Sequence, residues 1–291
     1  GVGQLAIRLA DFDVLVLNRE RTTLNRALIS RLPALKLICQ TGRVGPHVDL
    51  AAAAEHGVKV VEGFGDPVAP AELTWALILA ASRKIPQYAS LMKQGLWQAT
   101  SIHPAQNTLG RTLNSRMLGI WGYGHIGQRV ARFAQAFGMQ VTVWGSDASR
   151  DQAVADGFSA ASSKAALFEQ SDVLSLHLRL SDSTRHSVLA DDLAQMKPDA
   201  LIVNISRAEL IAPGALEAAL RAGRPGYAAL DVFESEPLSP TATLLQLDNV
   251  LATPHIGFVE QDSYEKYFRP AFEAIVDFAN GRPVNDVASN R

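Results

Sequence analysis

The glycines at positions 122, 124 and 127 restrict the possible folds of this chain more than any other feature. They form the pattern G-x-G-x-x-G directly after an apolar stretch at 117–121, typical of a strand, and just before a helical pattern at 128–137. The first glycine permits a tight turn, the second lets the backbone approach a pyrophosphate, and the third lets helix and strand pack closely. The motif predicts a dinucleotide-binding unit, although glycines at such a turn can also be purely steric. The candidate cofactor-binding residues are Gly122, Gly124, His125, Ile126 and Gly127.

A regular alternation of apolar runs and helical patterns extends this prediction along the chain. Further apolar runs lie at 13–18, 35–42, 58–63, 141–145, 173–178, 200–206, 228–232 and 250–255. Helical patterns separate many of them, which favours parallel sheets with helices on their faces. We therefore predict an α/β fold of two doubly wound parallel-sheet domains, a Rossmann dinucleotide-binding domain inserted in a smaller, flavodoxin-like substrate domain.

The composition of the stretch after residue 96 sets the predicted domain boundaries. A helical pattern at 71–95 tolerates Pro86 and suits a bridge between domains, and the polar stretch at 101–115 suits an entry to a second one. The substrate domain is predicted at 1–96 plus 265–291, and the dinucleotide-binding domain at 97–264.

The length, charge and cysteine content of the chain limit its partners. With 291 residues it exceeds what one hydrophobic core usually serves, so two domains are expected. A formal net charge of -2 gives no field for binding a polyanion, so no nucleic-acid partner is predicted. No apolar run approaches the ~20 residues that span a bilayer, and Cys39 is the single cysteine. We therefore predict a cytoplasmic protein without membrane contact, disulfide or metal site.

The opening residues, GVGQLAIRLADFD, contain neither an initiator Met nor the features of a signal peptide. The amino terminus is therefore expected to be incomplete.

The strand after the glycine motif bears on the choice of cofactor. In dinucleotide-binding folds that strand usually ends in a carboxylate that binds the adenosine ribose. Here it ends at Gly145, followed by Ser146, Asp147 and, further on, Arg150. Either Asp147 binds the ribose from the loop, or Ser146 and Arg150 bind a 2′-phosphate that no carboxylate at the strand tip would repel. We predict NAD or NADP as the cofactor and hypothesise that NADP is accepted.

Four later residues carry candidate chemistry. Arg207, Asp231 and His255 lie at or after the ends of apolar runs, and Glu236 follows Asp231 by five residues. Hydride transfer at a 2-hydroxy acid needs an arginine for the carboxylate and carbonyl, a histidine that moves the hydroxyl proton, and a glutamate that favours the charged imidazolium. The alternatives are a surface ion pair for the arginine, a structural histidine and a turn-forming aspartate.

Several ordered motifs resemble one enzyme family over nearly the whole chain. They are ICQTG with VDLAAAAEHGV, ELTWALILAASR, GIWGYGHIG, LSLHLRLSDSTRH, MKPDALIVNISRAELI, ALDVFESEPL and NVLATPHIG. The sequence is similar to the D-isomer-specific 2-hydroxyacid dehydrogenases, in the branch of D-3-phosphoglycerate dehydrogenases and glyoxylate/hydroxypyruvate reductases. The resemblance implies an NAD(P)-dependent oxidoreductase that transfers a hydride between the nicotinamide and a D-2-hydroxy acid or 2-keto acid. It also implies a homodimer formed through the nucleotide domain.

The resemblance assigns roles to the candidate residues. Arg207 matches the substrate-binding arginine, Glu236 the glutamate that orients the histidine, and His255 the acid/base histidine. Asp231 matches the aspartate on the nicotinamide carboxamide side.

The resemblance also extends to two loops. His177 is interpreted either as support for the loop beside the nicotinamide or as a buried structural residue. The loop at 40–45 resembles a backbone-amide loop that faces the substrate carboxylate, with the candidates Thr41, Gly42 and Arg43, although Arg43 can also be a solvated loop residue.

The sequence departs from the family pattern in three places. Ala208 stands where glycine commonly follows the arginine, Arg179 stands where proline often occurs, and no counterpart of the family's first strand and helix precedes Gly1. Two other functions remain as alternatives: an NAD(H)-sensing interaction protein of the corepressor type, and a formate or phosphite dehydrogenase. Formate dehydrogenases commonly have glutamine in place of Glu236, so the hydroxyacid chemistry is favoured.

Overall fold

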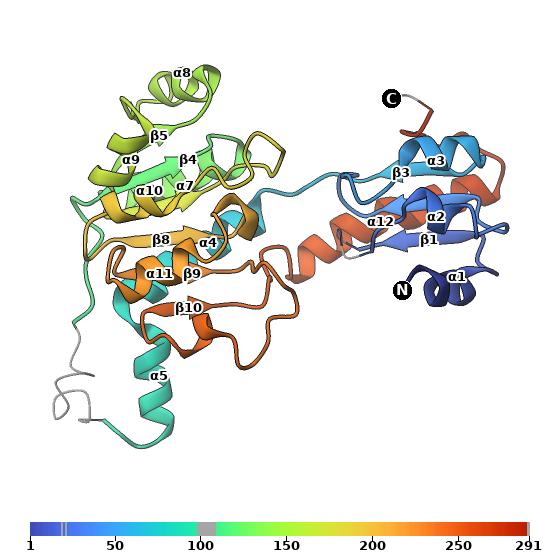
Figure 1. Cartoon of the computed structure of the whole chain (residues 1–291). Helices are drawn as coiled ribbons and strands as arrows, with labels where there is room; N and C mark the ends of the chain where they lie inside the picture. Colours follow the sequence, from blue (N-terminus) through green and yellow to red (C-terminus); the bar gives the residue numbers. More distant parts are fainter. Residues whose placement is uncertain (19, 21, 98–108, 290–291) are drawn as a thin grey trace. The chain divides into compact units, whose positions relative to one another are not determined.

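The structure, a computed structural model, describes residues 1–18, 20, 22–97 and 109–289. The chain divides into a smaller compact unit, Gly1–Asp66 with Phe258–Arg291, and a larger one, Pro67–Gly257 (Figure 1). Each unit contains a parallel sheet with helices on both faces, so the predicted α/β fold class is confirmed. None of the helices in the described part of the chain has the length and apolar character needed to cross a bilayer.

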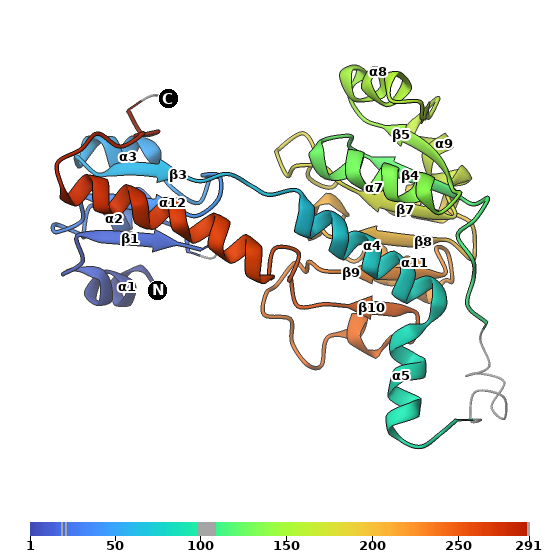
Figure 2. The ribbon, with the colours of Figure 1, turned by 180° about the vertical axis from the view of Figure 1, so that it is seen from behind.

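The smaller unit is built on a parallel sheet with the strand order β1-β2-β3. Its elements are α1 (Val2–Leu9), β1 (Val14–Leu17), α2 (Arg26–Ile29), β2 (Leu37–Gln40), α3 (Leu50–Glu55), β3 (Lys59–Glu62) and α12 (Gln261–Ala279). Successive strand residues point to opposite faces. Ile38 and Val60 pack in the cluster with α1, α2 and α3, whereas Leu37 and Cys39 pack against α12. Figure 2 shows α12 lying across this second face.

The sheet of the larger unit has the strand order β10-β9-β8-β7-β4-β5-β6, and all its strands are parallel. Its elements are α4 (Val68–Arg83), α5 (Ile85–Lys93), β4 (Met117–Trp121), α7 (His125–Ala136), β5 (Gln140–Trp144), α8 (Asp147–Ala155), β6 (Ser159–Ala160), α9 (Lys164–Gln170), β7 (Val173–Leu176), α10 (Ala190–Gln195), β8 (Leu201–Asn204), η1 (Ala208–Leu210), α11 (Ala215–Arg221), β9 (Tyr227–Leu230), η2 (Thr243–Gln246) and β10 (Val250–Ala252). The order reverses between β4 and β7, as expected for a Rossmann fold. The sequence pattern missed β6, because two exposed residues give no apolar run.

Helices cover both faces of the larger sheet. Trp75 and Ile78 of α4 pack with α7 on one face, which Figure 2 views. Phe168 of α9, Leu193 of α10 and Leu216 of α11 pack on the other, which Figure 1 views. Every residue of β7 and β8 is buried, which explains why these strands, VLSL and LIVN, are mostly apolar and do not alternate with exposed polar residues.

The two units differ in their bounds from the predicted domains. The prediction assigned 71–95 to the smaller domain, but α4 packs on α7, β8 and β9, so the larger unit begins at Pro67. At the other end the larger unit closes at Gly257, and the whole of α12 belongs to the smaller unit. The predicted boundary between residues 96 and 97 follows α5 within the described part of the chain, whereas residues 98–108, which contain most of the polar entry segment, lie outside it.

The helix predicted at 71–95 is two helices. The break lies at Lys84, which has a left-handed φ of 54°. Pro86 then lies in the first turn of α5, where a missing N–H leaves no intrahelical hydrogen bond unmade. The periodicity continues across the break, because both helices have apolar residues at helical spacing.

Two of the three motif glycines are required by packing. A Cβ on Gly127 would lie 2.4 Å from the Gly122 carbonyl oxygen, and a Cβ on Gly122 would lie 2.7 Å from the His177 carbonyl oxygen. Gly122 also has a φ of 98°. A Cβ on Gly124 would meet nothing within 4 Å. Gly127 therefore permits the close approach of α7 to the β4 turn, as the motif predicts.

We expect Gly127→Ala to destabilise the larger unit by about 1–3 kcal/mol, because the added methyl group forces α7 away from a backbone carbonyl. Gly124→Ala is the matched control and should change the free energy of unfolding by less than about 0.5 kcal/mol. Urea unfolding followed by tryptophan fluorescence measures this, because Trp75, Trp97, Trp121 and Trp144 all lie in the larger unit. Equal unfolding midpoints for the two variants would contradict this account of α7 packing.

Candidate active site

The parallel strands bring the predicted residues of the larger unit to one edge of its sheet. The glycine loop follows β4, where the strand order reverses. Arg207, Asp231 and His255 follow β8, β9 and β10, which are neighbours in the sheet. Ligands of open α/β sheets bind at this carboxyl edge.

The glycine loop has the shape that a dinucleotide needs. Gly124 is the N-cap of the 12-residue helix α7, which has no side-chain cap, so its first N–H groups are available to a phosphate. The open space beside Gly124 lets a pyrophosphate approach the backbone. Tyr123 anchors the loop, because its buried hydroxyl donates to the Asp156 carboxylate at 2.9 Å. His125 is exposed and Ile126 packs on the core, and a direct cofactor contact for either stays a prediction.

The end of β5 presents a cation where a carboxylate is usual. The Arg150 guanidinium lies 4.6 Å from the centre of the Trp144 ring and pairs with Asp147, whose side chain is 88% exposed. Ser146 caps α8, its hydroxyl accepting a hydrogen bond of 3.3 Å from the Ser149 amide. The predicted phosphate-binding pair, Ser146 and Arg150, therefore lies within one helical turn.

His177 is a half-buried residue directly beside the glycine loop. Its Nε2 lies 2.9 Å from the hydroxyl of Ser175, and its Nδ1 is buried without a hydrogen-bond partner in the described part of the chain. Desolvation lowers the pKa of His177 to about 4, so its ring is neutral at physiological pH. The Cβ contact noted for Gly122 shows that His177 limits the shape of the glycine loop through its carbonyl.

The structure brings Glu236 and His255 together from the loops after β9 and β10. The His255 Nδ1 lies 2.9 Å from Oε1 and 2.7 Å from Oε2 of Glu236. A carboxylate only accepts hydrogen bonds, so Nδ1 carries the hydrogen and proton exchange falls to Nε2. Oε1 also accepts a bond of 3.1 Å from the Phe233 amide, which fixes the carboxylate. This is the predicted histidine–glutamate pair.

The backbone at His255 is strained and is held by Asp231. His255 has a left-handed φ of 54°, which costs a residue with a Cβ roughly 1–2 kcal/mol. The fully buried Asp231 accepts bonds from the Thr253 hydroxyl at 2.6 Å and from the Ile256 and Gly257 amides at 2.8 Å. Burial raises the pKa of Asp231, and these bonds and His255 oppose the rise. Both carboxylate oxygens of Asp231 thus accept hydrogen bonds from the loop after β10. The contact of Asp231 with the nicotinamide stays a prediction.

A second buried polar residue, Asn204, shapes the loop of Arg207. Its Nδ2 donates to the Arg207 carbonyl at 2.9 Å, and its Oδ1 accepts from the Ser206 amide at 3.0 Å. The Ser206 hydroxyl donates to the Leu176 carbonyl at 2.8 Å and so ties the loop to the end of β7. Arg207 is among the residues predicted from the sequence, whereas Asn204 is not. Its signal was a polar residue in the last position of an apolar strand.

The other substrate-binding candidates belong to the smaller unit, in the loop after β2. Thr41 is buried, and the Gly42 carbonyl accepts a bond of 2.9 Å from the Gly63 amide. Arg43 pairs with Glu62 at 2.7 Å. The end of β3 and the residue after it thus hold this loop, and the contact of the loop with substrate stays a prediction.

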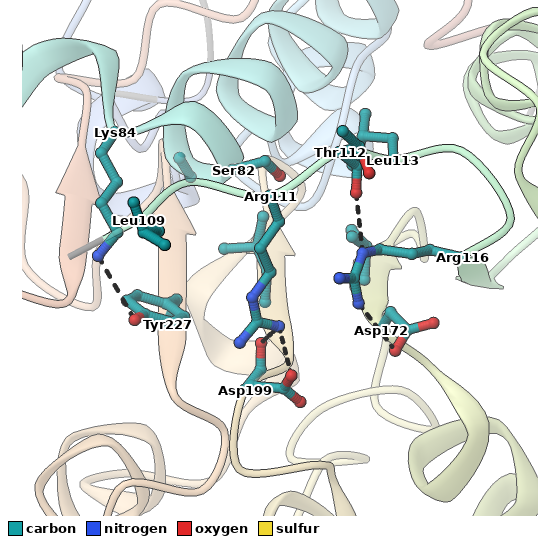
Figure 3. A pocket seen from close by; sticks show the side chains of 13 residues that line it. Ser82, Lys84, Leu109, Arg111, Thr112, Leu113, Arg116, Asp172, Asp199 and Tyr227 are labelled. Carbon is teal, nitrogen blue, oxygen red and sulfur yellow. Dashed lines mark hydrogen bonds and ion pairs between the residues drawn. The ribbon is translucent and has the colours of Figure 1, made fainter.

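A small cavity of about 30 Å³ lies at the opposite, amino edge of the larger sheet (Figure 3). Arg111 pairs there with Asp199 at 2.7 Å, and the Lys84 Nζ lies 4.7 Å from the centre of the Tyr227 ring. These charged groups are bonded within the cavity wall, and the glycine loop lies at the other edge. The cavity is therefore separate from the candidate active site.

Comparison with known proteins identifies the family of the chain. The family model for the D-isomer specific 2-hydroxyacid dehydrogenase, NAD binding domain, matches residues 75–257, a stretch that ends with the larger unit. The glyoxylate reductase of Aeropyrum pernix is 36% identical over 258 residues, which cover 88% of this chain and 76% of that protein. The D-3-phosphoglycerate dehydrogenase of Methanocaldococcus jannaschii is 37% identical over 255 residues. These cover 87% of this chain but 47% of that protein, so the chain spans about half of that relative's length.

A solved structure extends the similarity to the whole chain. The crystal structure of an oxidoreductase from Ralstonia solanacearum is 53% identical and superimposes with a TM-score of 0.93, covering 99% of this chain and 86% of that one. The chain therefore belongs to the D-isomer specific 2-hydroxyacid dehydrogenase family, as an NAD-dependent oxidoreductase.

Proposed function

We propose that the protein interconverts a D-2-hydroxy acid and its 2-keto acid with NAD(P), and that this reaction takes place at the carboxyl edge of the larger sheet. The observation that carries this proposal is the contact of the His255 Nδ1 with both oxygens of Glu236, at 2.9 and 2.7 Å. In this assignment His255 is the acid/base, Glu236 orients it, and Arg207 binds the carboxylate and carbonyl of the substrate.

The chemistry follows from the three side chains. In reduction, the Nε2 of charged His255 donates a proton to the carbonyl oxygen while the carbonyl carbon receives a hydride, and oxidation reverses both transfers. The bound dinucleotide supplies or accepts that hydride. Glu236 stabilises the charged imidazolium before proton transfer, because a neighbouring carboxylate favours it. The Arg207 guanidinium holds the substrate carboxylate through paired hydrogen bonds and polarises the carbonyl.

The proposed substrates are small 2-keto acids of the glyoxylate and hydroxypyruvate type. Relatives bearing the names glyoxylate reductase and hydroxypyruvate reductase support this class. The contribution of Thr41, Gly42 and Arg43 to binding the substrate is part of the same proposal.

We further propose that NADP(H) is accepted as well as NAD(H). The support is the turn after β5, where Ser146 caps α8 and Arg150 stacks on Trp144. Gly145 stands at the strand tip, where related folds have a carboxylate. The Ser146 hydroxyl and the Arg150 guanidinium suit a phosphate monoester.

A homodimer is proposed on the character of α5. Ile85, Tyr88 and Met92 are 52%, 36% and 50% exposed and share one face of this helix, which has no buried residue. An exposed apolar stripe of this kind suits contact with a second copy of the chain.

We expect His255→Ala to lower kcat for glyoxylate or hydroxypyruvate reduction by about 10²–10⁴-fold, because the proton donor is removed. The dissociation constant for NADH, measured by fluorescence titration, should stay within twofold. His186→Asn is the control, since His186 is an exposed histidine of the same unit with a similar φ of 53°. A kcat of His255→Ala within tenfold of the unmutated protein would refute the assignment.

Glu236→Gln should shift the pH dependence of kcat for reduction without abolishing the reaction. A neutral amide no longer favours the charged imidazole, so the loss of kcat on raising the pH should begin roughly one to three pH units lower. The measurement is kcat between pH 5 and 9 for both proteins. An unshifted profile would show that Glu236 does not support the protonated ring.

Ser146→Asp should raise the KM for NADPH at least tenfold and leave the KM for NADH within about threefold. Aspartate remains a good N-cap, so α8 is kept while a negative charge meets the 2′-phosphate. Ser146→Asn, a neutral cap of the same shape, is the control and should behave like the unmutated protein. A strong preference of the unmutated protein for NADH over NADPH would contradict the proposal that NADP(H) is accepted.

A further inference from the structure

We propose that Asp231 is a positioning residue for His255: its buried carboxylate holds the backbone after β10 so that the imidazole stays in place for proton transfer. The inference rests on the proposed function. It gives Asp231 a role through His255, which differs from the contact with the nicotinamide expected from sequence.

The hydrogen bonds of Asp231 enclose His255 on both sides. Oδ1 accepts from the Thr253 hydroxyl at 2.6 Å, two residues before the histidine, and from the Ile256 amide at 2.8 Å, directly after it. Oδ2 accepts from the Gly257 amide at 2.8 Å. The carboxylate therefore fixes the orientation of the peptide group that follows His255.

This support is needed because His255 has a backbone conformation that its Cβ disfavours. Its φ is 54°, and its amide donates to the Thr253 carbonyl at 2.9 Å, which closes a tight turn. The Glu236 carboxylate bonds to the imidazole of His255 and orients the ring. The backbone that carries the ring is held by Asp231, and such strained residues persist where their surroundings hold them.

The chemistry of the contact calls for a carboxylate. Three donors converge on two oxygens, and Asp231 is fully buried, so an acceptor-only group satisfies every member of the cluster. An asparagine has the same shape, but its NH₂ group would face a donor, either the Gly257 amide or the pair formed by Thr253 and Ile256. Asp231→Asn therefore disturbs the positioning with little change in volume.

The experiment compares Asp231→Asn, Thr253→Val and Thr253→Ser in the full chain, with glyoxylate or hydroxypyruvate and NADH. Asp231→Asn should lower kcat at least tenfold and leave the dissociation constant for NADH within twofold. The primary deuterium isotope effect on kcat, measured with deuterated NADH, should rise because the chemical step becomes limiting. Thr253→Val, which removes one donor, should lower kcat several-fold in the same manner. Thr253→Ser keeps the hydroxyl and should restore kcat.

The outcomes separate this inference from its alternatives. A kcat of Asp231→Asn within twofold of the unmutated protein overturns it. So does a weakened affinity for NADH with an unchanged isotope effect, which would make Asp231 a cofactor contact. If Asp231→Asn does not fold, the contrast between Thr253→Val and Thr253→Ser decides, and equal kcat values overturn the inference. Absence of turnover in the unmutated protein refutes the proposed function itself and is thus a distinct result.

Discussion

Every strand of the larger sheet runs in the same direction, and the arrangement of the candidate site depends on this constraint. Neighbouring parallel strands lie about 4.8 Å apart, so the loops after β8, β9 and β10 leave the sheet within about 10 Å of one another. The histidine–glutamate contact is formed between the loops of β9 and β10. The strand order reverses between β4 and β7, so the chain continues from β4 to β5 on one side and from β7 to β8 on the other. The glycine loop follows β4 at this point.

Buried polar side chains then give these loops their shape. A buried polar group without a partner costs roughly 1–3 kcal/mol, so a buried asparagine or aspartate strongly favours the one loop conformation that satisfies it. Asn204 does this for the loop of Arg207, and Asp231 does it for the loop of His255. Arg207 and His255, which are proposed to bind the substrate and move its proton, are half-buried and lie on those loops. Positioning and chemistry thus fall on different side chains.

The sequence predicted the fold class and the histidine–glutamate pair, because apolar periodicity and ordered motifs are local signals. It could not predict the break at Lys84, since two successive helices share one apolar pattern and only packing decides where the chain turns. The start of the larger compact unit differs from the predicted boundary for the same reason: α4 packs on β8 and β9, which follow it by more than 100 residues. The role of Asn204 likewise appears only once its partners, including the end of β7, are in place.

The turn after β5 contains opposing charges, and their magnitudes indicate which one dominates. An exposed ion pair such as Asp147–Arg150 contributes roughly 0–1 kcal/mol. A phosphate monoester carries a charge of roughly −1.5 to −2 and forms charge-assisted bonds about twice as strong as neutral ones. Arg150 is also held by the Trp144 ring, independently of Asp147. The Asp147 carboxylate would therefore weaken the proposed attraction of Arg150 for a 2′-phosphate without removing the cation, whereas a carboxylate at the strand tip would oppose the phosphate directly.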